Sequence, residues 1–217
     1  MKKYLYVMLA IFMALSFNAC SSSDDNEKDS PTEKPDSPNP SNPSSDLGKI
    51  LVVYYSYTNH VKTIINDLET QISADVVRVE PTEKGLDYAA NNYAIGSSQI
   101  QAIRDNPNSA TSYPVIDPVD VKFENYATVI VATPLWWSNM AAPMQSFLFS
   151  HKADLAGKNI GLIVSSSSSG ISGVEEDAKR LIPEGKFLSP SLWIRSSQTS
   201  SCHSLSAKWL EEIGYKK

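Results

Sequence analysis

A hydroxyl-rich turn follows the first strongly apolar segment after residue 46. Residues 50–55 read ILVVYY, and the polar residues 56–59 (SYTN) come directly after them. From Val61 onward, apolar residues recur at helical spacing. A turn between a strand and a helix presents free backbone N–H groups and the positive end of the helix dipole, which together favour a bound anion such as phosphate. An ordinary, well-capped turn is the alternative interpretation.

Two further segments place chemically useful residues after apolar runs. Residues 134–140 (PLWWSNM) carry two adjacent tryptophans, and residues 165–173 (SSSSSGISG) are small and polar. A ligand with an anionic tail, a flat aromatic body and a polar ring edge would match the three turns. Packing tryptophans and a serine-rich linker are the alternative interpretations. Ser56 is a poor candidate for a hydrolase nucleophile, because the sequence has no G-x-S-x-G motif.

The elements around these turns alternate between strand and helix. Apolar segments that lack polar alternation predict strands over 50–55, 75–80, 127–133, 159–165 and 187–195. Five strands joined by crossovers indicate an open, doubly wound α/β sheet with helices on both faces. In such sheets the ligand lies beyond the carboxyl ends of the strands, where the three turns would meet.

Two parts of the sheet region are less regular. Pro190 interrupts the last predicted strand, which places that strand near an edge or a bulge. Residues 82–118 are long and weakly periodic, and their path is not defined by the sequence. Tyr88 and Tyr93 in this insert would pack either on the sheet or on a ligand.

The first 46 residues differ in composition from the rest. Two lysines precede an apolar run over residues 4–17, which is typical of a secretory signal peptide, here residues 1–19, and is short for a membrane span. Cys20 follows a small residue at the expected cleavage point and resembles the acylated cysteine of a bacterial lipobox. Residues 20–46, rich in Ser, Pro and Asp, are expected to be a disordered tether. Plain secretion with an unmodified Cys20 is the alternative.

These features indicate a protein that is lipid-anchored to a bacterial membrane, outside the cytoplasm and facing the periplasm or the cell surface. Loss of the signal peptide removes two lysines and no acidic residue, which leaves 17 basic (19 minus 2) and 24 acidic residues. A formal charge of −7 (17 minus 24), without a basic patch, argues against a nucleic-acid partner.

Metal binding and an internal disulfide are both disfavoured. His60, His151 and His203 are far apart and lack the spacing of metal ligands. Cys202 would have no partner within the chain if Cys20 carries lipid.

The three turns resemble those of the flavodoxin-like, FMN-binding family. SYTNHV resembles the SxTGNT phosphate loop, and TPLWWSNMAAPMQSFL resembles the P-x-WW-G-x-M-x-x-P-x-x-x-FL segment. SSSSSGISGVEEDAKRLIP resembles the third loop of that family, which precedes a D-x-K-x-L-x-P helix. The resemblance implies that residues 47–217 form a three-layer sandwich around a five-stranded parallel sheet of order 2-1-3-4-5, with FMN bound at its edge.

The resemblance also implies three groups of cofactor-binding residues. Those around the phosphate would be Ser56, Tyr57, Thr58, Asn59, His60 and Val61. Those along the ribityl chain and isoalloxazine ring would be Pro134, Leu135, Trp136, Trp137, Ser138, Asn139 and Met140. Those at the pyrimidine edge would be Ser166, Ser167, Ser168, Ser169 and Gly170.

Several positions depart from the family pattern. Asn59 replaces a glycine, but asparagine adopts positive φ more readily than most residues, so we expect the turn to survive. Val61 replaces a threonine and removes one donor to the phosphate. His60 would either supply a charge-assisted contact in its place or cap the helix. Ser138 and residues 167–168 also replace glycines, and side chains at 167–168 would crowd the flavin edge.

Two functions follow from this pattern. The first is a membrane-tethered flavodoxin-like protein that binds FMN and transfers electrons, as a carrier or as a small flavin-dependent reductase with an unidentified redox partner. The second is a flavodoxin-fold lipoprotein that has lost FMN and serves as a binding or scaffold protein. The sequence carries no dinucleotide fingerprint, so a nicotinamide would bind only transiently.

Overall fold

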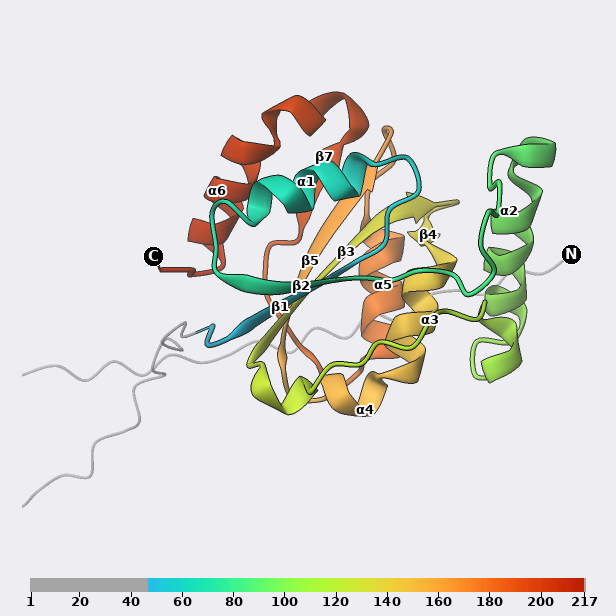
Figure 1. The fold of residues 1–217 in the computed structure, drawn as a ribbon, viewed down its shortest axis with the longest axis horizontal. Helices are drawn as coiled ribbons and strands as arrows, with labels where there is room; N and C mark the ends of the chain where they lie inside the picture. The colour runs from blue at the N-terminus through green and yellow to red at the C-terminus, as the bar shows by residue number, and fades with distance from the viewer. Residues whose placement is uncertain (1–46, 217) are drawn as a thin grey trace, which may run out of the picture. The chain divides into compact units, whose positions relative to one another are not determined.

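The computed structural model describes residues 47–216 (Figure 1). The strands are β1 (Ile50–Tyr54), β2 (Ala74–Arg78), β3 (Thr128–Trp136), β4 (Asn139–Met140), β5 (Asn159–Ser166), β6 (Lys186–Phe187) and β7 (Leu192–Arg195). The α-helices are α1 (His60–Leu68), α2 (Ala90–Asp105), α3 (Ala142–Ser150), α4 (Lys152–Leu155), α5 (Ser172–Leu181) and α6 (Cys202–Glu212). Short 3₁₀ helices are η1 (Ala110–Ser112), η2 (Phe123–Asn125) and η3 (Ser196–Ser201). The predicted signal peptide, the lipidation site at Cys20 and the tether over 20–46 lie outside the described residues.

The strand order confirms the predicted α/β sheet. The main path is β2-β1-β3-β5-β6, and β7 also pairs with β5. If β6 and β7 are taken as two parts of one edge strand, this is the expected order 2-1-3-4-5. Pro190 lies in the gap between those two parts, where the missing N–H of a proline removes no ladder hydrogen bond. The sequence did not predict β4, which pairs antiparallel with the end of β3.

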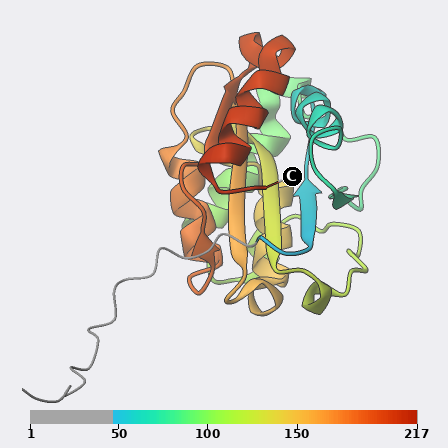
Figure 2. The same ribbon diagram turned by 90° about the vertical axis from the view of Figure 1, so that its left-hand side faces the viewer.

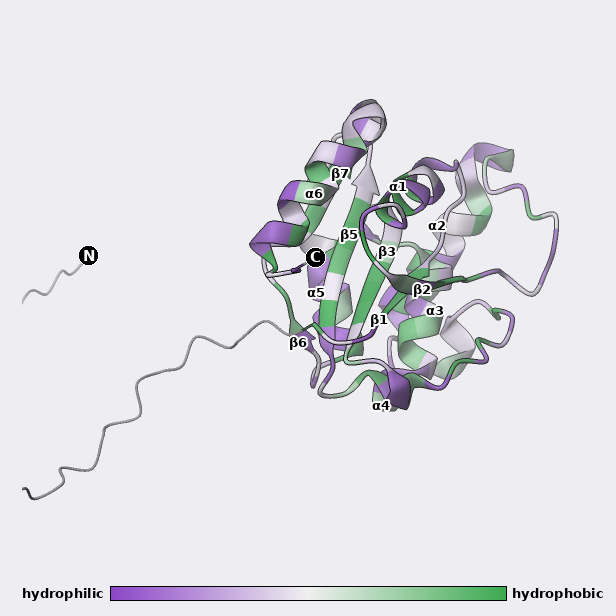
Figure 3. Ribbon diagram, turned by 60° about the vertical axis from the view of Figure 1, so that its left-hand side comes forward, coloured by the Kyte–Doolittle hydropathy of each residue, from purple (hydrophilic) through white to green (hydrophobic). Residues whose placement is uncertain are grey.

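Alternate residues of the central strands face opposite helical layers. Leu51 and Val53 belong to the cluster that α3 and α5 complete, whereas Ile50 and Val52 belong to the cluster that α1 and α6 complete. Figures 1 and 2 show α1 and α6 together on one side of the sheet, with α3 and α5 on the other. Figure 3 shows that β3 and β5 are hydrophobic along most of their length, as strands buried on both faces should be.

The insert over 82–118 becomes ordered by packing rather than by local periodicity. Its main element, α2, packs against α3 and the end of β3. The first turn of α2 is irregular, because Asn91, Asn92 and Tyr93 have φ values of 50°, 56° and 62°. Within residues 47–216, no helix has the length and apolar character needed to cross a membrane.

Candidate functional site

A cavity of about 350 Å³ opens at the carboxyl ends of β1, β3 and β5. All three turns that the sequence singled out contribute to its wall. The predicted residues that line it are Ser56, Tyr57, Thr58, His60, Val61, Pro134, Leu135, Trp136, Trp137, Ser166 and Ser167. Turns separated by up to about a hundred residues therefore meet around one space, because the parallel strands that precede them end at the same edge of the sheet.

Other predicted residues lie close to this wall without lining it. Asn59 is the N-cap residue of α1, and Ser138, Asn139 and Met140 belong to the β3–β4 hairpin, in which Met140 is fully buried. Residues 168–170 are exposed at the far side of their turn.

The structure adds lining residues that the sequence did not assign to the site. These are Tyr88, Tyr93, Gly96, Ser165 and Ser196. The insert supplies the first three, and the two tyrosines were the only signal that it faces a ligand. Ser196 comes from the segment after the edge strand, for which the sequence offered no signal.

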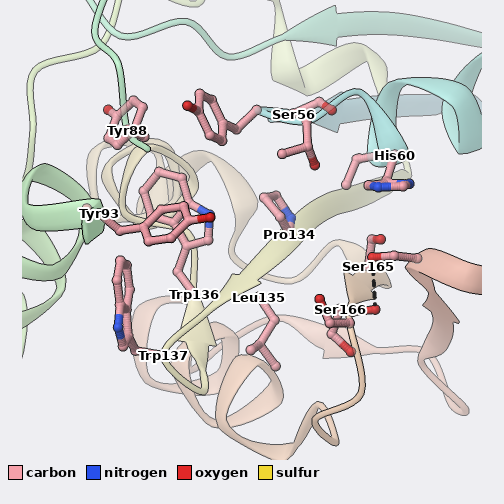
Figure 4. A pocket seen from close by; sticks show the side chains of 16 residues that line it. Ser56, His60, Tyr88, Tyr93, Pro134, Leu135, Trp136, Trp137, Ser165 and Ser166 are labelled. Carbon is pink, nitrogen blue, oxygen red and sulfur yellow. Dashed lines mark hydrogen bonds between the residues drawn. The ribbon is translucent and has the colours of Figure 1, made fainter. Parts of the chain in front are cut away.

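The cavity has two chemically different ends. Figure 4 shows the rings of Tyr88, Tyr93, Trp136 and Trp137 gathered at one end. The small polar groups and His60 lie toward the other end, with Pro134 between the two groups. Such a cavity suits an elongated ligand that is flat and aromatic at one end and polar or charged at the other.

The polar end is built on the start of α1. Asn59, the N-cap residue, has φ 65° and ψ −3°, so the turn adopts the positive φ that a glycine would otherwise provide. The buried Ser56 hydroxyl accepts a hydrogen bond from the Lys62 N–H at 3.2 Å. A hydroxyl that accepts a hydrogen bond keeps its own proton, so Ser56 is still able to donate to a ligand.

His60 is oriented from outside the turn. Its Nδ1 lies 3.1 Å from the Thr199 hydroxyl oxygen, and that hydroxyl donates to the Ser196 carbonyl at 2.9 Å. Because the single hydroxyl proton is already committed, the network assigns the N–H of this contact to His60 Nδ1. The other ring nitrogen, Nε2, is the one left for a ligand: an acceptor on the neutral ring and a donor on the protonated ring. The N-cap residue Asn59 makes no side-chain capping bond to α1.

Trp136 is held within a cluster of aromatic rings. Its ring lies edge-on to Tyr55, with centroids 5.6 Å apart, and 4.8 Å from the ring of Tyr88. Burial raises the pKa of Tyr55 and of Tyr88, so both phenols stay neutral at physiological pH. Trp137 and Tyr93 form the open rim, with 42% and 52% of their surfaces exposed.

The serine-rich turn is partly occupied by its own hydrogen bonds. The Ser166 hydroxyl accepts from Trp193 Nε1 at 2.8 Å and donates to the Ser169 carbonyl at 2.8 Å. Its side chain therefore shapes the turn before any ligand binds. Ser167 and Ser168 are exposed, and of the two only Ser167 lines the cavity. Within residues 47–216, no group of three or more His, Cys, Asp or Glu side chains is arranged to hold a metal ion.

Comparison with known proteins places the fold in a family. The model of the flavodoxin family matches residues 49–213. The chain belongs to the flavodoxin family. This confirms the family resemblance inferred from the three turns.

Solved structures of other flavodoxin-like proteins share the fold. A candidate flavoprotein from Bacteroides eggerthii is 21% identical, with a TM-score of 0.62, and the match covers 77% of this chain and 99% of that one. A flavoprotein from Lactobacillus acidophilus in complex with FMN is 18% identical, with a TM-score of 0.56 and coverage of 72% and 99%. A candidate flavoprotein from Bacteroides uniformis is 18% identical, with a TM-score of 0.58 and coverage of 76% and 98%.

The tryptophans of this flavodoxin-family chain lie on a tight hairpin. Trp136 pairs with Asn139, so Trp137 and Ser138 form a two-residue loop, with φ values of 46° and 65°. Positive φ at both loop positions is typical of the hairpin turns that match strand twist, and glycine or asparagine usually occupies them. Gly173 on α5 lies directly against this loop, since a Cβ added there would be 2.0 Å from the Ser138 carbonyl oxygen.

We predict that Gly173→Ala displaces the hairpin and destabilises the protein. Overpacking of this kind costs about 1–3 kcal/mol, which outweighs the roughly 0.5–1 kcal/mol that alanine gains over glycine inside a helix. Urea unfolding should give a lower free energy of unfolding for this variant than for wild type. Gly170→Ala is the matched control, because a Cβ there meets nothing within 4 Å. Equal unfolding free energies for the two variants would contradict the prediction.

Proposed function

We propose that the cavity binds FMN non-covalently and that the protein transfers electrons, as a carrier or as a small flavin-dependent reductase tethered to a membrane. The observation that carries the proposal is the two-ended cavity at the carboxyl edge of the sheet. Its polar end starts at a helix N-terminus and its other end is lined with aromatic rings. FMN has the matching form, with a phosphate at one end and a planar ring system at the other.

The polar end supplies several kinds of phosphate contact. His60 and Val61, the first two residues of α1, line the cavity, and a helix start of this kind favours an anion through its free N–H groups and its dipole. Ser56 and Thr58 also line the cavity, and the Ser56 hydroxyl keeps a proton to donate. His60 Nε2 adds a charge-assisted donor when the ring is protonated. These groups offset the hydroxyl that Val61 lacks.

The aromatic end supplies a surface for a planar ring. Trp136 and Trp137 form one wall, and Tyr88 and Tyr93 lie beside them. When bound, FMN would supply the electron chemistry, whereas the residues of the chain bind it, orient it and exclude water from one side. The L. acidophilus flavoprotein that shares this fold was solved with FMN, which supports the same ligand here.

We expect the purified protein to bind FMN with a micromolar or lower dissociation constant. Titration should quench the fluorescence of the cavity tryptophans, and the complex should be yellow. Lack of binding at micromolar FMN would refute the proposal and favour the scaffold function. In that case Asn59→Gly combined with Ser167→Gly and Ser168→Gly should create binding that the natural chain lacks.

We predict that His60→Gln weakens FMN binding and leaves riboflavin binding unchanged, because riboflavin has no phosphate. Loss of a charge-assisted hydrogen bond costs roughly 1.5–3 kcal/mol, which is about tenfold or more in affinity. Equilibrium titrations of wild type and variant with FMN and with riboflavin test this. A variant that loses affinity for both flavins equally would assign His60 a structural role instead.

The composition of the first 46 residues supports the proposed membrane tether. We expect the mature protein to begin at Cys20 with a lipid attached, followed by a polar, proline-rich spacer. Mass spectrometry of the protein purified from membranes should find an N-terminal lipopeptide, and Cys20→Ser should abolish it. An unmodified N-terminus beyond Cys20 would remove the lipid anchor from the proposal.

A further inference from the structure

The tryptophan turn in the cavity wall has an unfavourable backbone conformation. Trp137 and Ser138 both have positive φ, although neither is glycine. A side chain with a Cβ disfavours this conformation, so the turn persists only where its surroundings hold it. The contacts around the turn therefore decide whether the indole rings stay in place.

Asp177 holds the strand that leaves the turn. Asp177 lies on α5, and the residue is 6% exposed. Its Oδ2 accepts hydrogen bonds from the Asn139 side-chain amide and from the Met140 backbone N–H, both at 2.9 Å. Bonds to a carboxylate are stronger than bonds between neutral groups. One buried carboxylate thus fixes the two residues that follow Ser138.

A closed ring of hydrogen bonds keeps Asp177 in position. Arg180 donates to Asp177 Oδ1 at 2.9 Å and to the Gln145 side-chain oxygen at 2.8 Å. Gln145, which is 1% exposed, donates in turn to the Met140 carbonyl at 2.8 Å. The ring thus passes through Asp177, Met140, Gln145 and Arg180. Both backbone polar groups of Met140 are held, one by a side chain of α5 and the other by a side chain of α3.

Arg104, on α2, holds the turn from the opposite side. It donates to the Trp137 carbonyl at 2.7 Å through Nη2 and to the Asn139 side-chain oxygen at 2.9 Å through Nε. Asn139 therefore lies between a guanidinium and a carboxylate, and its amide is oriented by both. The turn is held between two charged side chains that come from different helices.

We propose that Asp177 is a positioning residue for the cavity: through Asn139 and Met140, and together with Arg104, it holds the left-handed Trp137–Ser138 turn in the geometry that a planar ring requires. This inference rests on the proposed function for the ligand, but the restraint on the turn is a property of the free protein. Asp177 itself lies behind the hairpin and is not among the residues that line the cavity.

The first test needs no ligand. In the Asp177→Asn variant the side chain at position 177 has one oxygen instead of two. Its amide NH₂ group must therefore face either Arg180 or the N–H donors of Asn139 and Met140. Amide hydrogen exchange at Met140 should then be about tenfold faster than in wild type. Glu176→Gln is the matched control, since it makes the same charge change at an exposed neighbour on α5. Unchanged exchange at Met140 in the Asp177 variant would overturn the proposal.

The second test uses flavin binding. The turn lies at the aromatic end of the cavity, so Asp177→Asn should weaken FMN and riboflavin by the same factor, about tenfold. His60→Gln should weaken FMN alone, which separates positioning of the ring from contact with the phosphate. Ser138→Gly relieves part of the left-handed penalty. In that background, Asp177→Asn should therefore cost markedly less affinity, about threefold or less. An equal cost in both backgrounds would overturn the proposal.

Two outcomes separate this inference from the proposed function. If wild type binds no flavin, the proposed function fails while the exchange result still decides the restraint on the turn. If wild type binds flavin, and the Asp177→Asn and Glu176→Gln variants have the same flavin affinity and the same amide exchange at Met140, only this inference fails. If the Asp177→Asn variant does not fold, Arg104→Gln removes the hydrogen bonds that hold the turn from the side of α2, at an exposed position. It should also make amide hydrogen exchange at residues 137–140 faster than in wild type. Unchanged exchange there would count against the proposal.

Discussion

The pairing of β3 with β1 on one side and β5 on the other is the constraint on which the site depends. Ala132 on β3 is in register with Tyr54 on β1 and with Ile163 on β5. Because the three strands run parallel and end near the same level, their following turns emerge side by side. A shift of one residue in either pairing would turn buried side chains to the opposite layer, so the two cores fix the register and with it the shape of the cavity.

The fold could be predicted from the sequence because its strands are apolar runs and its turns interrupt them cleanly. The β3–β4 hairpin could not, since Trp137 and Ser138 lack the glycine or asparagine that usually marks such a loop. Their conformation is imposed by side chains from α2 and α5, which are distant in sequence. Ser196 was missed for a similar reason: only tertiary packing brings η3 beside α1.

The two ends of the cavity are stabilised in different ways. At the polar end, the turn itself is built locally, from an asparagine with positive φ, a serine hydroxyl and the start of one helix, and only the orientation of His60 depends on the distant Thr199. At the aromatic end, long-range contacts dominate, with Tyr55 and Tyr57 after β1, Tyr88 of the insert and Trp136 of β3 packed on one another. Sequence motifs report local geometry well, which is why the hydroxyl-rich turn and the tryptophan segment were both recognised, whereas the packing of Tyr88 and Tyr93 was left open.

The insert over 82–118 provides Tyr88, Tyr93 and Gly96 to the cavity wall, whereas Thr58, His60 and Val61 come from the turn before α1 and from its first residues. Gly96 lies so close to the rim that an added Cβ would be 3.1 Å from the Trp137 ring. Sequence changes confined to this one segment would remodel the aromatic rim of the cavity while leaving its polar end untouched. Related chains that differed only there would admit different molecules at the rim on the same sheet.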